Sequence, residues 1–260
     1  MGAPAKDILA ASQARPWPVP ARPWTMWQVW SDLLFAHWPI PAATMAAALP
    51  PGLELDTWEG EAWLGVIPFR MPTIQLRAAP NPPPFTHLIE TNVRTYVTVD
   101  GKPGVYFFSL DADNPITVQA ARIWFGLPYF NARFVCDFAR PDGSVRYAMR
   151  RADHRARPAA LDVDYRPIGL AQPAAPGSLA DWLTARYALY VTNRHGDIMR
   201  GDITHAPWNL APAEAEFRAN TLAASHGFTL PDIPPLLHFS RRLDTLAWTA
   251  RPTAGAQNPH

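Results

Sequence analysis

Residues 87–99, HLIETNVRTYVTV, carry the clearest alternation of apolar and polar positions in the chain. The odd positions from Ile89 to Val99 are apolar or β-branched. The even positions on the opposite side are Glu90, Asn92, Arg94 and Tyr96. Because successive side chains of a β-strand point to opposite faces, this pattern predicts a strand with one apolar face and one polar face.

The neighbouring segments predict further strands joined by turns. The turn sequence DGKPG at 100–104 predicts a hairpin between residues 87–99 and a second strand over 105–112. Residues 62–69, AWLGVIPF, are typical of a buried strand. The aromatic-rich residues 25–38 fit a strand or a helix, since periodicity alone does not separate the two.

Start and stop signals predict a few short helices among these strands. Asn114 followed by Pro115 is typical of a helix N-terminus, and Gly126 is typical of its end. A capping-box pattern begins at Ser178. The predicted helices are residues 41–49, 115–125, 178–187 and 213–225. The expected fold class is therefore mainly β, of the α+β kind.

Length and composition favour one domain. The chain has 260 residues, 48% of them hydrophobic and 17% charged, which suits a single β-barrel. Residues 1–23 are rich in proline and predict a flexible arm. We expect one barrel domain over residues 24–252 and a frayed C-terminus over 253–260.

Charge and residue usage exclude several classes of partner and cofactor. The formal net charge is only +1, which does not favour nucleic-acid binding. No stretch of about 18 apolar residues predicts a membrane span. Cys136 is the single cysteine, which fits a reducing compartment, and we expect a cytoplasmic protein. The histidines lack the spacing of a metal site and no glycine-rich phosphate loop occurs, so neither a metal nor a cofactor is predicted.

Eight segments spread along nearly all of the chain resemble one bacterial family. They are SDLLFAHWPI, LPPGLELDTWEGEAWLGVIPFRM, ETNVRTYV, GVYFFSLDA, ARIWFGLPYF, LTARYALY, HAPWNLAPAEAE and LLHFSRRLDTLAW. In this order they look like the YqjF-like family of bacterial proteins. That family has no established function, so this resemblance implies membership without implying an activity.

A more distant resemblance covers roughly residues 60–135. Ala121-Arg122 stands where acetoacetate decarboxylase and its relatives have Gly-Arg, and Gly126-Leu-Pro-Tyr-Phe130 stands where they have Gly-Phe-Pro-Lys-Lys. The segment is similar to that decarboxylase family. The resemblance implies an antiparallel β-barrel or cone that encloses a pocket, with a short helix leading into the motif strand.

The decarboxylase reaction needs a lysine amine that forms a Schiff base with a ketone. Tyr129 stands at the lysine position, and a phenol cannot form an imine. The chain has only two lysines, Lys6 in the expected arm and Lys102 in a turn where water would keep its pKa high. We therefore expect the fold of the family without its Schiff-base chemistry.

The polar positions of the motif region form the candidate site. Glu90 and Tyr129 are the candidate catalytic residues, as acid/base and as oxyanion donor. The plainer interpretation of Tyr129 is an aromatic side chain that packs the cavity with its hydroxyl satisfied. The candidate ligand-binding residues are Asn92, Arg94 and Arg122. Ser109 and Asp111 share a strand face, but the sequence indicates no histidine to complete a Ser-His-Asp triad.

Three functional hypotheses fit these residues. The first is a protein that binds a small organic acid or ketone-like molecule in a barrel pocket. The second is a lyase or hydrolase that uses Glu90 without a Schiff base, so whether the chain is an enzyme stays open. The third is a structural or interaction protein whose barrel is filled by its own side chains. The tryptophan-rich residues 24–38 also suggest a homo-oligomer edge.

Overall fold

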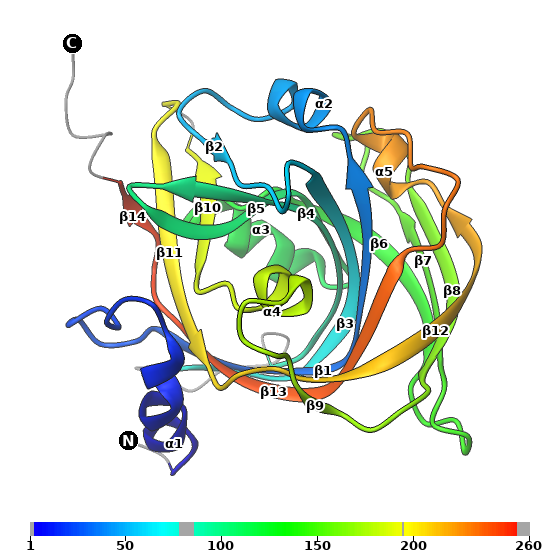
Figure 1. Ribbon diagram of the computed structural model, residues 1–260, viewed down its shortest axis with the longest axis horizontal. Helices are drawn as coiled ribbons and strands as arrows, with labels where there is room; N and C mark the ends of the chain where they lie inside the picture. The colour runs from blue at the N-terminus through cyan, green and yellow to red at the C-terminus, as the bar shows by residue number, and fades with distance from the viewer. Residues whose placement is uncertain (1–2, 78–85, 194, 254–260) are drawn as a thin grey trace.

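The computed structural model describes residues 3–77, 86–193 and 195–253, and about half of them lie in strands (Figure 1). The strands are β1 (Met26–Ile40), β2 (Glu54–Leu55), β3 (Ala62–Leu76), β4 (Leu88–Val99), β5 (Lys102–Ala112), β6 (Tyr129–Asp137), β7 (Val145–Arg151), β8 (Ala160–Pro167), β9 (Gln172–Pro173), β10 (Ala188–Thr192), β11 (Ile198–His205), β12 (Asn209–Asn220), β13 (Leu236–Ala247) and β14 (Arg251–Pro252). The helices are α1 (Ala3–Ala10), the 3₁₀ turn η1 (Ala11–Ala14), α2 (Ala42–Ala47), α3 (Pro115–Phe125), α4 (Leu179–Thr184) and α5 (Leu222–Ser225).

The sheet closes into two rings that share a wall. The first ring runs through β1, β3, β4, β5, β10, β11 and β13, and the pairing of β11 with β13 closes it. The second ring leaves β5 through β6, β7, β8 and β12 and returns to β13. The pairings of β5 with β10 and with β6 are parallel, so the sheet is mixed, although most pairings are antiparallel. The prediction of a mainly β barrel-like fold with a few short helices is confirmed.

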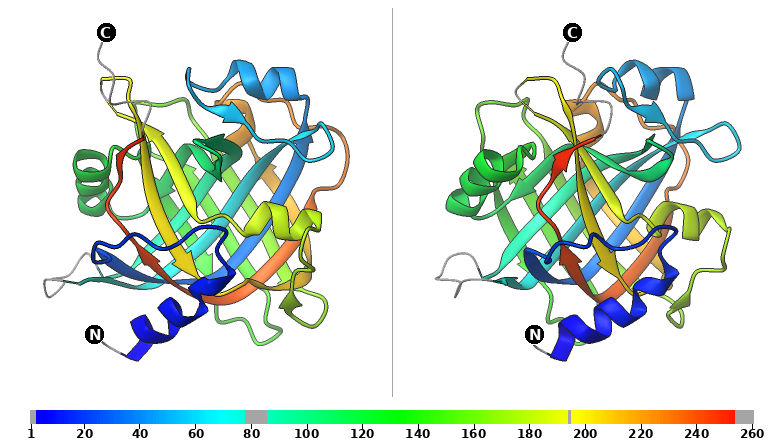
Figure 2. Two further views of the ribbon diagram at one scale, coloured as in Figure 1. Left: turned by 60° about the vertical axis from the view of Figure 1, so that its left-hand side comes forward. Right: turned by 90° about the vertical axis from the view of Figure 1, so that its left-hand side faces the viewer.

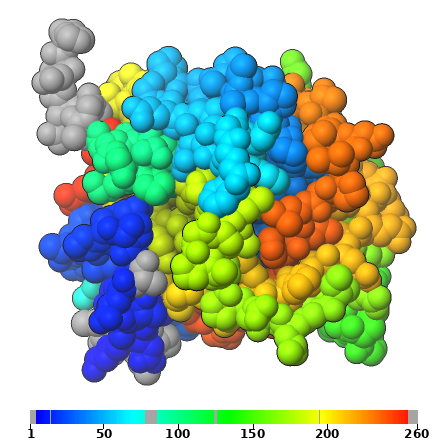
Figure 3. All heavy atoms as spheres, viewed as in Figure 1, coloured from blue at the N-terminus to red at the C-terminus, as the bar shows by residue number. Residues whose placement is uncertain are grey.

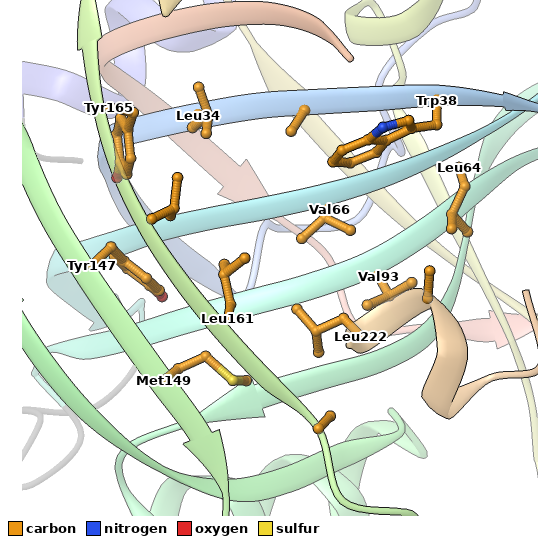
Figure 4. Close-up of a cluster of buried hydrophobic side chains, with 14 of the residues drawn as sticks. Leu34, Trp38, Leu64, Val66, Val93, Tyr147, Met149, Leu161, Tyr165 and Leu222 are labelled. Atoms are coloured by element: carbon orange, nitrogen blue, oxygen red, sulfur yellow. The ribbon is translucent and has the colours of Figure 1, made fainter. Parts of the chain in front are cut away.

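The shared wall is buried on both faces. On β4, Leu88 belongs to the core inside the first ring, and Val93 belongs to the core inside the second ring. Figure 4 shows this second core, in which Val66 and Val93 of the wall face Tyr147 and Leu161 of β7 and β8. The polar face predicted for residues 87–99 therefore lines the interior of the first ring and does not face solvent.

Helices α3 and α4 lie at opposite ends of the first ring (Figures 1 and 2). The predicted start of α3 is confirmed, because the Asn114 side chain accepts hydrogen bonds from the N–H groups of Ile116 and Thr117. Its predicted end is confirmed too, since Gly126 adopts the left-handed conformation with φ 65°. Ser178 caps α4 through the Asp181 N–H. No helix formed by the described residues has the length and apolarity needed to span a membrane.

Two expectations differ from the structure. Residues 213–225 are not one helix, because 209–220 form strand β12 paired with β8 and only Leu222–Ser225 are helical. The sequence AEAEF alternates with period two, and this alternation outweighs the helix propensity of its alanines and glutamates.

The N-terminal segment is the second difference. In place of a loose arm, residues 3–10 form α1, whose Ala5 and Ile8 are buried against Leu246 and Trp248. This apolar contact holds the segment on β13. The expected frayed C-terminus, residues 253–260, lies almost entirely outside the described residues. The domain limits of 24–252 stay a prediction.

Candidate functional site

Glu90 and Tyr129 meet inside the first ring. Strand β4 directs Glu90 inward, and the Tyr129 Oη donates a hydrogen bond of 2.7 Å to the Glu90 Oε2. Both side chains are buried, with Glu90 only 3% exposed. Burial raises the pKa of Glu90 from 4.5 to about 7, although the hydrogen bonds from Tyr129 and Asn92 oppose this rise. The candidate acid/base is thus half-ionised near neutral pH.

Tyr129 acts as a hydrogen-bond donor at this site. Burial and the neighbouring Glu90 carboxyl raise its pKa well above the ordinary value of 10.0, so the phenol keeps its proton. The structure thus brings together two residues that the sequence analysis had named separately, and their catalytic roles stay predictions. A proton-bearing phenol beside a titrating carboxyl can donate a hydrogen bond to that carboxyl or to a ligand oxygen.

The local sequence after α3 explains how Tyr129 reaches this position. Gly126 ends the helix in the left-handed conformation, and the Tyr129 N–H donates to the Leu127 carbonyl at 2.8 Å. Strand β6 then begins in parallel register with β5, where Leu110 is the partner of Tyr129. The Gly-Leu-Pro turn therefore delivers the Tyr129 ring to the same interior as Glu90.

Asn92 and Arg94 follow Glu90 along the inner face of β4. The Asn92 side chain is buried, and its Oδ1 has no hydrogen-bond partner among the described residues. The Arg94 Nη2 donates to the Leu183 carbonyl at 3.2 Å, which lies at the end of α4. Four residues of strand separate Arg94 from Glu90 by about 13 Å. Asn92 thus belongs to the Glu90 end of the interior, and Arg94 belongs to the α4 end.

Arg122 supports the backbone of the motif strand. From α3, its Nη1 donates to the Tyr129 carbonyl at 2.9 Å. Desolvation lowers the pKa of Arg122, and the nearby Arg155 lowers it further. The structure brings Arg122 next to Tyr129, although this hydrogen bond is to the main-chain carbonyl of Tyr129 and not to its phenol. A direct role of Arg122 in ligand binding stays a prediction.

A second buried polar cluster lies on the other face of the shared wall. Arg151 on β7 binds both carboxylate oxygens of Asp111 at 2.6 and 2.7 Å, and its Nη2 also donates to the Ser109 Oγ at 3.0 Å. His226, directly after α5, places its Nε2 3.0 Å from the same Ser109 Oγ. Ser109, Asp111 and Arg151 all lie in the interior of the second ring.

Sequence reasoning placed Ser109 and Asp111 on one strand face but missed Arg151 and His226, because these partners are far away in the chain. Ser109 and His226 are separated by 117 positions. The available signal was Asp111, an acid on an otherwise apolar strand, which required a buried cation as partner. The cluster is not a catalytic triad, since Asp111 binds Arg151 instead of His226 and Ser109 is fully buried. Desolvation lowers the pKa of His226 to about 4, which favours a neutral ring beside Ser109.

A cavity of about 760 Å³ opens at the α4 end of the first ring. Its walls include Trp182, Arg186, Tyr187 and Trp208. Trp208 also packs in the same core as Tyr129, so it lies between this cavity and the Glu90 region. Glu90, Asn92 and Tyr129 do not line the cavity themselves. Among the described residues, no group of three His, Cys, Asp or Glu side chains is placed to hold a metal ion.

Solved structures share this architecture. The enduracididine biosynthesis enzyme MppR complexed with pyruvate is similar with a TM-score of 0.60 and 14% identity, over 91% of this chain and 93% of that one. Acetoacetate decarboxylase from Legionella pneumophila subsp. pneumophila str. Philadelphia 1 has a TM-score of 0.59 and 15% identity, over 94% of both chains. At such identities the likeness shows the fold alone, and it confirms the expected decarboxylase-like fold.

Sequence comparison gives a nearer relative. The uncharacterized protein YqjF of Bacillus subtilis (strain 168) is 43% identical over 233 residues, which are 90% of this chain and 94% of that protein. The model of the DUF2071 family of uncharacterized conserved proteins matches residues 27–244, from β1 through most of β13. The chain therefore belongs to the DUF2071 family.

Proposed function

We propose that the protein binds a small, partly apolar organic acid or ketone-like molecule inside the first ring, without forming a Schiff base. The observation that carries this proposal is the buried Glu90 carboxyl, which is hydrogen-bonded to Tyr129 and has a pKa of about 7. Perturbed titratable groups in protein interiors concentrate at functional sites. A carboxyl that titrates near neutral pH donates to a ligand oxygen when protonated and accepts from a ligand hydroxyl when ionised.

The unpartnered polar atoms of β4 support the same proposal. Asn92 Oδ1 and Arg94 Nε are buried without a hydrogen-bond partner among the described residues. Buried polar atoms nearly always have a partner in folded proteins, so these two atoms favour a bound polar molecule or water. An acceptor group of the ligand would satisfy the Arg94 N–H, and a donor group would satisfy the Asn92 oxygen. Among the structural neighbours, MppR was crystallised with pyruvate, which is a small keto acid.

The positions of the two lysines support the proposal that no Schiff base forms. Lys6 is on the exposed side of α1, and Lys102 begins β5 beside a different cavity. Tyr129, which stands at the lysine position of the decarboxylase pattern, keeps its proton as a phenol. Binding in this ring would therefore rest on hydrogen bonds and apolar contact alone.

Ligand screening tests the binding proposal. We expect pyruvate or acetoacetate at millimolar concentration to raise the melting temperature of the protein by a few degrees at pH 6, because a ligand that binds only the folded state stabilises it. This ligand-induced rise in melting temperature should be smaller in the Glu90→Gln, Asn92→Ala and Arg94→Met variants. The exposed Glu61→Gln variant should keep it, as the matched control for loss of a carboxylate.

A shift that survives all three interior substitutions would contradict the proposed location. If none of a panel of small carboxylic acids and ketones changes the melting temperature of the wild-type chain, the binding proposal is contradicted, and the third hypothesis is favoured.

The Glu90 pKa also favours a second candidate function, that of a lyase or hydrolase with Glu90 as general acid/base. A catalytic acid/base works best when its pKa lies near the working pH. We expect any turnover of such a ligand to fall by about 100-fold or more in Glu90→Gln and to depend on pH around 7. Borohydride treatment with acetoacetate should leave the protein mass unchanged. A covalent adduct on Lys102 or Lys6 would contradict the exclusion of a Schiff base.

A further inference from the structure

A small cavity on the N-terminal side of the molecule collects positive charge. It has a volume of about 250 Å³. Figure 3 shows the neighbourhood, in which the N-terminal segment in blue meets the start of β5 in blue-green and β14 in red. The lining residues with charged side chains are Arg22, Lys102, Arg200, Asp202 and Arg251. Four cationic side chains and one carboxylate thus line the cavity. This local excess of positive charge contrasts with the net charge of the whole chain, which is only +1.

The single carboxylate is already occupied by other partners. The Asp202 Oδ1 accepts from the Arg15 Nη2 at 3.2 Å and from the Trp17 Nε1 at 3.3 Å. The Asp202 Oδ2 accepts from the Arg200 Nε at 3.4 Å. Asp202 therefore neutralises at most one positive charge, since Arg15 and Arg200 share it.

The other three cations lack a carboxylate partner within the described part of the chain. The Arg22 Nη2 donates to the main-chain carbonyl of Thr249 at 2.7 Å, and Asp202 acts on its charge only from beyond ion-pair distance. Lys102 and Arg251 make no ion pair with a described residue. These side chains come from three separate parts of the sequence, so the fold itself assembles the cluster.

The strand register places two of the arginines directly opposite each other. Arg200 on β11 is the antiparallel partner of Arg251 on β14. Like charges at directly opposed positions destabilise a strand pair. Arg251 and Arg200 also help to lower the pKa of Arg22, after the larger effect of its burial. This arrangement has an electrostatic cost that a bound anion would offset.

We propose that this cavity binds the phosphate group of a small phosphorylated molecule. A phosphate dianion matches the excess of positive charge, and arginine forms bidentate hydrogen bonds with phosphate oxygens. A volume of about 250 Å³ accommodates a phosphate with a small organic group. Trp17, Pro18 and Pro20 supply an apolar wall for that group. The residues of this cavity are different from those of the Glu90 site, so the proposal does not rest on the function proposed above.

Calorimetric titration tests the anion site. We expect inorganic phosphate and glycerol 3-phosphate to bind the full chain in a phosphate-free buffer of low ionic strength, and we expect sodium chloride to weaken the binding. Arg251→Gln and Lys102→Gln should each raise the dissociation constant by about tenfold or more, since each removes a charged donor. Arg133→Gln on β6 changes the net charge equally at an exposed position and should leave binding unchanged.

The melting temperature separates an anion site from a purely structural cluster. Without phosphate, Arg251→Gln should melt at the same temperature as the wild-type chain or higher, because it removes the repulsion with Arg200. Tighter binding of glycerol 3-phosphate than of inorganic phosphate supports an organic phosphate as the ligand. Equal binding of the two probes identifies free phosphate and contradicts the proposed organic group. The proposal is wrong if neither probe binds the wild-type chain, or if both Arg251→Gln and Lys102→Gln bind as the wild-type chain does.

Discussion

Replacing Arg151 with methionine is expected to lower the free energy of unfolding by about 3–5 kcal/mol, which is the usual cost of breaking a buried ion pair. The Arg151 and Asp111 side chains are 1% and 0% exposed, and they form two hydrogen bonds with each other. Without the guanidinium, the Asp111 carboxylate would stay buried with no compensating charge. The Ser109 hydroxyl would lose a donor as well. Urea unfolding at 25 °C and pH 7 measures the loss.

Arg146→Met is the matched control, because Arg146 lies on the same strand and also pairs with an aspartate. Its partner Asp162 is 31% exposed at the side chain, so the loss should stay within about 1 kcal/mol. A double variant, Arg151→Met with Asp111→Leu, should recover much of the stability, since it leaves no unpaired charge. Equal losses in Arg151→Met and Arg146→Met would mean that water reaches the Asp111 carboxylate.

Glu90→Gln should change how stability depends on pH. The pKa of Glu90 rises from 4.5 to about 7 on folding, so the folded state binds more protons than the unfolded state between these values. For a carboxyl with a raised pKa, stability is therefore lost as the pH increases through this window. The loss amounts to about 3 kcal/mol once Glu90 is ionised. Relative to wild type, the glutamine variant should thus gain about 3 kcal/mol between pH 4 and pH 8.

The difference in the free energy of unfolding between wild type and Glu90→Gln separates the effect of Glu90 from that of the other titrating groups. Burial lowers the pKa values of His205 and His226 to about 4, and these groups make the folded state more stable as the pH rises from 4 to 6.5. Their contribution is common to both proteins and cancels in the difference. A difference that does not vary with pH would show that the Glu90 pKa is ordinary, and it would remove the main support for the proposed site.

The local pattern was sufficient to predict the elements around the candidate site. Alternation placed Glu90 and Asn92 on one face of a strand, and capping residues defined both ends of α3. Alternation does not reveal which side of a strand meets water. Both faces of β4 are buried, and that fact depends on β7 and β8, which come much later in the chain, at Val145–Arg151 and Ala160–Pro167.

The contacts that tune the site come from positions distant in the chain, and local sequence does not predict them. Tyr129 reaches Glu90 across 39 positions, and the resemblance to the decarboxylase motif marked the two residues separately without predicting their hydrogen bond. Arg94 was expected on the same strand face as Glu90, but the alternation gave no sign that its side chain donates to the Leu183 carbonyl at the end of α4. His226 reaches Ser109 only because α5 closes one side of the second ring, and a single histidine in a loop carries no signal of that contact.

The wall shared by the two rings restricts how the chain can change in length. On β4, Asn92 belongs to one interior and its neighbour Val93 belongs to the other. An insertion or deletion of one residue there would reverse every later side chain of the strand, and polar groups would enter the second core while valines entered the candidate site. Loops between the strands can grow or shrink over generations without this exchange. Among descendants of this chain, changes in length should accumulate outside the wall strands, and the polar row of β4 should keep its spacing even where its residues are replaced.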